Sequence, residues 1–100
     1  MNVHIALYKW KASASRADID VALHEIELLA GKVPGVIEIS TGQNTSKHSE
    51  GYTHVILVRG EDQAAIDAYR AHPDHERIAR DIEAMEAHGI GVDFETKPSA

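Results

Sequence analysis

Two stretches of the chain alternate in the way β-strands do, yet both alternate sets of each stretch are largely apolar. In residues 3–10 the two sets are Val3, Ile5 and Leu7 against His4, Ala6, Tyr8 and Trp10. In residues 52–59 the two sets are Thr53, Val55 and Leu57 against Tyr52, His54, Ile56 and Val58. A strand with two apolar sides must be covered on both faces, so these patterns predict strands inside a layered structure.

Two further strands are predicted at residues 36–41 and 90–96. In the earlier one we expect Ile37 and Ile39 to share one face, with Val36 on the other. The later strand alternates Ile90, Val92 and Phe94 against Gly91, Asp93 and Glu95. Its aliphatic and aromatic set should therefore lie on one face of the sheet and Asp93 on the other.

A helix is predicted between the first two strands. Ser15 followed by Asp18 resembles a capping box and predicts a helix that runs to about Ala30 and stops at Gly31. Its apolar residues follow helical spacing and form one stripe. They are Ile19, Ala22, Leu23, Ile26, Leu29 and Ala30.

A second helical region opens at residues 60–62 and breaks at His72, and a further helix then runs to residues 87–89. Pro73 suits the first position of that helix, because its missing N–H would have no partner there. His75 falls in the first turn, where the helix dipole opposes protonation and favours a neutral imidazole.

The element order β-α-β-β-α-β predicts an α+β, ferredoxin-like fold, with one antiparallel sheet and helices on one face. Residues 1–97 should form one domain, and residues 98–100 a tail. The helices can cover only one face of the sheet, while Val3, Ile5, Leu7, Val55 and Leu57 still need cover on the other. We therefore expect a homodimer in which two sheets pack face to face.

Composition narrows the function. The chain of 100 residues carries 16 acidic and 10 basic side chains and has no basic run, which argues against nucleic acid as a partner. It has no cysteine and no apolar run long enough for a membrane span. We expect a cytoplasmic protein that does not bind membranes.

Seven histidines in 100 residues matter only if several of them converge. His4 shares a strand face with Tyr8 and Trp10, and His54 shares one with Ile56. If the aliphatic sets face a partner sheet, both histidines face the helices that carry Tyr69 and His75. The sequence thus predicts a cavity lined by two strand histidines and by a histidine and a tyrosine of the helices.

Such a cavity suits acid–base chemistry. A neutral His75 would take a proton next to a carbonyl group, and Tyr69 would donate a hydrogen bond to the developing enolate. His4 or His54 would position a second oxygen. A metal site at His72 and His75 is a weaker reading, because four ligands are not evident. In a purely structural reading, His54 is a hydrogen-bonded core residue and His72 caps a helix.

The residues His4–Lys11, Gly51–His54, Tyr69–His75 and Val92–Phe94 resemble the stress-responsive α/β-barrel (Dabb) family over nearly the whole chain. The resemblance implies ferredoxin-like homodimers that form dimeric α+β barrels, most of them without an established reaction, and we expect no cofactor in this chain. One catalytic relative is a plant polyketide cyclase, olivetolic acid cyclase, which closes a linear thioester by aldol condensation.

By that resemblance His75 is the base and Tyr69 its partner, and His4, His54 and His72 line the pocket. Asp93 matches an aspartate near the base. The cyclase has aromatic residues on its first helix, whereas this chain has smaller apolar ones, so a different substrate is implied. The chain's residues there are Ala22, Leu23 and Ile26.

Two readings stay open. One is a cofactor-independent cyclase or isomerase with a small apolar or carbonyl-bearing ligand, bound among His4, Tyr8, Trp10 and Ile56. The alternative is a non-catalytic, stress-responsive dimeric protein. Related dimeric barrels that include cofactor-free monooxygenases also leave an oxygen-handling role open.

Overall fold

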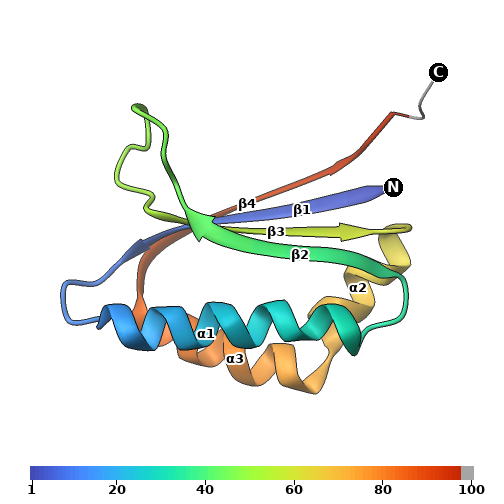
Figure 1. Ribbon diagram of the computed structural model, residues 1–100, viewed down its shortest axis with the longest axis horizontal. Helices are drawn as coiled ribbons and strands as arrows, with labels where there is room; N and C mark the ends of the chain where they lie inside the picture. Colours follow the sequence, from blue (N-terminus) through green and yellow to red (C-terminus); the bar gives the residue numbers. More distant parts are fainter. Residues whose placement is uncertain (98–100) are drawn as a thin grey trace.

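The computed structural model describes residues 1–97, which form a four-stranded antiparallel sheet with the helices on one face (Figure 1). The strands are β1 (Asn2–Trp10), β2 (Val36–Gln43), β3 (His54–Gly60) and β4 (Glu86–Glu95). The helices are α1 (Arg16–Leu28), a 3₁₀ turn η1 (Leu29–Gly31), α2 (Gln63–Ala71) and α3 (Pro73–Met85). The strand order β2-β3-β1-β4 is the ferredoxin-like arrangement, so the predicted fold class is confirmed.

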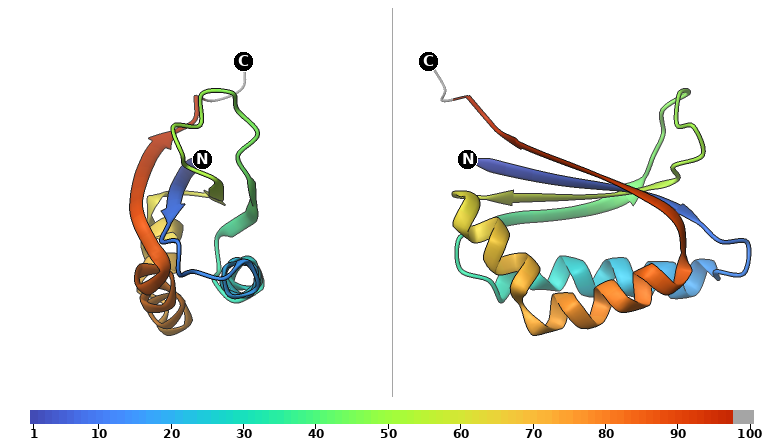
Figure 2. Two further views of the ribbon diagram at one scale, coloured as in Figure 1. Left: turned by 90° about the vertical axis from the view of Figure 1, so that its left-hand side faces the viewer. Right: turned by 180° about the vertical axis from the view of Figure 1, so that it is seen from behind.

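The core lies between the sheet and the helices. Helices α1 and α3 run side by side beneath the sheet, and α2 closes one end (Figure 2). Burial follows the predicted helical stripes, with the strands contributing a smaller set. The most deeply buried members are Ile26, Leu29, Val58, Ile66, Tyr69 and Ile78. The predicted tail at residues 98–100 lies outside the described residues.

Each of the α-helices α1, α2 and α3 begins where a side chain accepts a hydrogen bond from the first turn. The hydroxyl of Ser15 accepts from the backbone N–H of Asp18 at 3.1 Å, as the capping pattern predicted. The carboxylate of Asp62 caps α2 in the same way. Pro73 occupies the start of α3, also as predicted.

The face assignment of β2 was wrong because the strand contains a β-bulge. Val36 pairs with Gly60 and Glu38 pairs with Arg59, which leaves Ile37 as the extra residue. After the bulge, the alternation of side chains between the two faces is shifted by one residue. Val36 and Ile39 are consequently both buried, while Ile37 is 48% exposed.

The beginning of β4 also differs from the prediction. Residues 87–89 continue the sheet rather than end a helix, and β4 follows α3 directly at Glu86. Gly89 pairs with Tyr8 and His88 with Lys9, so sheet pairing with β1 overrides the local stop signal of the glycine. Strand β3 begins at His54, two residues later than predicted.

The sheet has one covered and one uncovered face. His4, Ala6 and Tyr8 of β1 face the helices, as predicted, and their alternates face outward. On the outer face, aliphatic residues of neighbouring strands are directly paired, for example Ile5 with Leu57 and with Val92. Val92 is 44% and Phe94 48% exposed, and the helices lie on the opposite side (Figure 2). None of the helices in residues 1–97 is long and apolar enough to cross a membrane.

Candidate functional site

A cavity of about 400 Å³ lies between β1, β4 and the helices α2 and α3. Its volume falls within the range of roughly 300–1,000 Å³ that is common for small-molecule sites. Most of the residues that line the cavity are apolar, and its polar side chains lie toward the ends. The lining residues are His4, Ala6, Tyr8, Ile26, Ile56, Tyr69, Arg70, His75, Ala79, Ile82, Glu83, Glu86, Gly89, Ile90 and Gly91.

His75 and Tyr69 meet in this cavity, as the sequence predicted. Tyr69 comes from the last turns of α2 and His75 from the first turn of α3, and their ring centres are 4.6 Å apart. Tyr69 is only 2% exposed. Its hydroxyl has no hydrogen-bond partner among residues 1–97. Every side-chain polar atom that is fully enclosed within these residues does have a partner, so the Tyr69 hydroxyl is not fully enclosed. The hydroxyl is therefore reached from the cavity.

Burial sets the protonation states of the pair. Desolvation lowers the pKa of His75 below its usual 6.5, and the positive charges of His4 and Arg70 lower it further. Desolvation raises the pKa of Tyr69, and it raises the pKa of Tyr8 to about 12. At neutral pH the cavity thus offers a neutral imidazole as a base and two phenols as hydrogen-bond donors.

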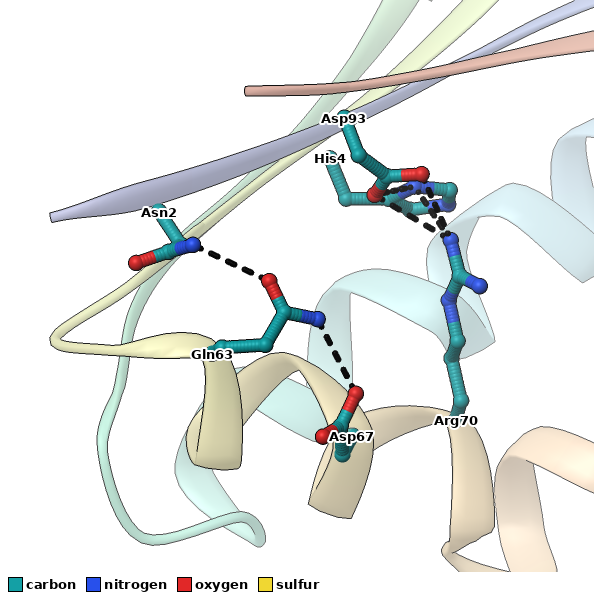
Figure 3. Close-up of polar contacts among 6 residues, drawn as sticks. All are labelled: Asn2, His4, Gln63, Asp67, Arg70 and Asp93. Atoms are coloured by element: carbon teal, nitrogen blue, oxygen red, sulfur yellow. Dashed lines mark hydrogen bonds and ion pairs between the residues drawn. The ribbon is translucent and has the colours of Figure 1, made fainter. Parts of the chain in front are cut away.

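His4 lies in the cavity wall and contacts two charged groups (Figure 3). Its Nδ1 is 2.8 Å from Asp93 Oδ1 and 2.8 Å from Arg70 Nη2. A single ring nitrogen can donate to the carboxylate or accept from the guanidinium, but cannot do both at once. Desolvation lowers the pKa of His4, against the opposing effect of the hydrogen bond with Asp93. Asp93 contacts His4 and Arg70, and its match to an aspartate near the base stays a prediction.

His54 does not line this cavity. The prediction that four side chains converge there is therefore wrong for His54. It faces the helices as expected, but it lines a separate hollow of about 160 Å³ beside α1 and β2. The Nε1–H of Trp10 donates to its Nδ1 at 2.9 Å. Trp10 also stacks on Tyr8, with ring centres 5.1 Å apart, behind the cavity wall rather than in it. Both residues act as partly buried core groups here.

His72 is likewise outside the cavity lining. Its Nδ1 accepts a hydrogen bond at 3.0 Å from the backbone N–H of Asp74 and caps α3. Across residues 1–97, no group of three or more His, Cys, Asp or Glu side chains has metal-binding geometry.

Three charged residues of the cavity were not predicted from the sequence. They are Arg70, Glu83 and Glu86. Helical spacing could have found the two glutamates. Positions 75, 79, 82, 83 and 86 lie on one face of a helix, so a cavity at His75 extends along that face. Arg70 follows Tyr69 directly and had no such signal, because its long side chain turns back toward β4.

A family model for the stress-responsive A/B barrel domain, Dabb, matches residues 3–96. This chain is a Dabb protein. It is also 32% identical over 79 residues to a stress-response A/B barrel domain-containing protein of Arabidopsis thaliana. That match covers 78% of the Dabb chain but 30% of the relative, so the chain spans about a third of that protein's length.

Solved structures with the same fold include a dimeric ferredoxin-like protein of unknown function from Jannaschia sp. CCS1. It is 28% identical, with a TM-score of 0.86 over 95% of the Dabb chain and 98% of its own. A hydroxynitrile lyase from Passiflora edulis is 18% identical, with a TM-score of 0.83 over 97% of the Dabb chain and 96% of its own. The lyase is similar in fold alone.

Proposed function

We propose that this Dabb protein is a cofactor-independent enzyme that removes a proton next to a carbonyl group of a small molecule. His75 is the base and Tyr69 is the hydrogen-bond donor. The observation that carries the proposal is their meeting in one cavity, the imidazole neutral and the phenol hydroxyl free of any protein partner within residues 1–97.

The chemistry follows from these two groups. Neutral His75 takes the proton from the carbon beside the carbonyl, and the electron pair moves onto the carbonyl oxygen as an enolate. Tyr69 donates its hydrogen bond to that oxygen, and His4 positions a second oxygen. Return of the proton at another carbon isomerises the substrate, whereas attack of the enolate on a second carbonyl closes a ring. Each well-placed acid–base group typically contributes about 10²–10⁴-fold to the rate.

Two further observations support this reading. The middle of the cavity is apolar, through Ala6, Ile26, Ile56 and Ile82, which suits the carbon skeleton of a small ligand. The hydroxynitrile lyase from Passiflora edulis shows that a protein of this fold can be a lyase, a class of enzyme consistent with the proposal.

We also propose that the protein is a homodimer formed through the outer face of the sheet. Val92 and Phe94 are 44% and 48% exposed on this face, and exposed apolar patches of this kind are typical of interfaces. The similar structure from Jannaschia is that of a dimeric protein. Because the cavity lies on the other face, pairing of the sheets leaves the helix-side site in each copy.

Deuterium exchange tests the catalytic proposal. Methyl 6-oxoheptanoate in D₂O is followed by NMR at the carbons beside its ketone, with wild type, His75→Ala and Tyr69→Phe. We expect wild type to accelerate exchange and both variants to lose at least about 100-fold of that rate. His48→Ala, in the exposed β2–β3 loop, is the matched control and should behave as wild type.

A non-catalytic dimer remains the second candidate, because two of the expected pocket histidines serve the fold. His54 holds Trp10 and His72 caps α3. The same experiment separates the two candidates. If no exchange is accelerated, and His75→Ala and Tyr69→Phe each lose several degrees of melting temperature, the pair is structural and the catalytic proposal fails.

A further inference from the structure

We propose that the cavity selects carbonyl compounds with an anionic end, such as a carboxylate, and that Arg70 binds this end. The inference rests on the proposed function and adds a substrate class to it. A ligand of this kind would carry its carboxylate at the α2 end of the cavity and its carbonyl beside Tyr69 and His75.

Arg70 extends from the last turn of α2 to the cavity wall formed by β1 and β4 (Figure 3). Its Nη2 lies 3.2 Å from each carboxylate oxygen of Asp93 and 2.8 Å from Nδ1 of His4. Within residues 1–97, Nε and Nη1 of Arg70 make no hydrogen bond to protein. A guanidinium carries five N–H donors in a planar fork, so one edge is left for a ligand.

Asp93 acts here as a positioning residue. Its contacts engage only Nη2 of the guanidinium, and because Arg70 lines the cavity, Nε and Nη1 remain available to a ligand. The pair contributes little to the fold, since Arg70 and Asp93 are 48% and 47% exposed and exposed ion pairs are weak. This arrangement therefore suits ligand binding better than stabilisation of the domain.

The far end of the cavity is acidic, whereas the α2 end carries the ion pair of Arg70 and Asp93. Glu86 and Glu83 lie near Tyr8, and burial together with their negative charges raises the pKa of its phenol. The carboxylate of Glu86 lies over Gly89, where an added Cβ would be 2.5 Å from Oε2. His4 and Tyr8 mark the two ends on β1 and are about 13 Å apart, at roughly 3.3 Å per residue.

This charge gradient orients an anionic ligand. The acidic end repels a carboxylate, and Arg70 attracts it to the end that also holds His4, Tyr69 and His75. The cavity volume of about 400 Å³ leaves room for the carbon chain of such a molecule. Only one orientation places both the charge and the carbonyl among complementary groups.

A matched pair of probes tests the inference. The binding of 6-oxoheptanoate and of its methyl ester is measured by NMR titration of the protein. We expect wild type to bind the acid at least about tenfold more tightly than the ester, as charge-assisted hydrogen bonds allow. Arg70→Gln should remove this preference. Arg77→Gln is the control, because Arg77 pairs with Glu25 on the surface away from the cavity.

The outcomes distinguish the two proposals. If wild type binds both probes equally and accelerates exchange in the ester, the selection by Arg70 is refuted while the proposed reaction stands. An acid preference that persists in Arg70→Gln would also refute it. If neither probe binds at concentrations on the order of 10 mM, near the weakest specific binding, the carbonyl site itself is refuted together with this inference.

Discussion

The face of the sheet that the helices cover carries more polar side chains than the face that they leave uncovered. In most folded proteins the covered face is the more apolar one. The face beneath the helices carries His4, Tyr8 and His54, and part of it encloses a cavity. The outer face carries directly paired aliphatic residues such as Ile5 and Leu57, and the helices leave it uncovered. Polar aromatic side chains are thus shielded within one chain, while the aliphatic side chains of the outer face would be covered only in the proposed dimer.

This difference assigns separate tasks to the two faces. An uncovered aliphatic face is a cost for an isolated chain and fits the proposed dimer. A hollow lined by histidines and tyrosines weakens core packing and fits the proposed ligand site. Substitutions on neighbouring residues of one strand, which point to opposite faces, should therefore have different consequences.

The largest effect is expected for Leu57→Asp on the outer face. A carboxylate between two packed sheets would lose its water without a partner, so the proposed dimer should become monomeric or aggregate. Light scattering gives the mass directly. Val21→Asp places the same change at a 58% exposed position of α1 and should leave the mass unchanged. An intact dimer of Leu57→Asp would refute the proposed interface.

A large effect of another kind is expected for Ile56→Ala, one residue away and 2% exposed on the inner face. Truncation of a buried isoleucine costs about 2–5 kcal/mol, so the free energy of unfolding should fall by that order. Dimer dissociation on dilution should change little. Leu57→Ala should show the reverse, with weaker dimerisation and a smaller loss of stability. Equal behaviour of the two variants would contradict the division of tasks.

A moderate effect is expected from acid. Burial lowers the pKa values of His4, His54 and His75, so below about pH 6.5 the unfolded chain binds protons that the folded chain does not. The stability from these residues is present above that pH and is lost as pH falls. At fixed protein concentration, the urea midpoint should decrease from about pH 7.5 to about pH 5, a range that spans the usual histidine pKa.

Replacement of the three histidines should flatten this pH dependence. The exposed His24 and His48 provide the control, since their replacement should leave the acid decrease as in wild type. A midpoint that stays constant or rises toward acid pH would contradict the buried, neutral state of the three residues.

The smallest effect is expected for His72→Ala. Loss of a helix cap costs about 1 kcal/mol, and the cavity should keep its affinity for 6-oxoheptanoate. His72→Asn should restore most of the stability, because asparagine is a good capping residue. A loss of ligand binding in both variants would place His72 in the site after all.

The fold was predictable because its signals are local. Apolar alternation in β1, the cap at Ser15 and the proline at the start of α3 each specify a short segment, and their order indicates the ferredoxin-like sheet. The bulge at Ile37 was not predictable in this way. It depends on how β2 pairs with β3, which no pattern within β2 encodes.

The site was predictable only in part, for the same reason. His4, Tyr69 and His75 were placed by strand phase and by the helix break. The partners of a side chain depend on tertiary positions, so the sequence did not distinguish a cavity histidine from one held by Trp10. Arg70 was not predicted because its long side chain extends across to the cavity wall, and no sequence motif marks that position.

A crystal structure of the protein with 6-oxoheptanoate would show whether the helix-side cavity binds a carbonyl compound. We expect ligand density in this cavity, with the ketone oxygen about 3 Å from the hydroxyl of Tyr69 and a neighbouring carbon facing His75. Density confined to another surface, or a collapsed cavity with the Tyr69 hydroxyl bonded to protein, would contradict this expectation.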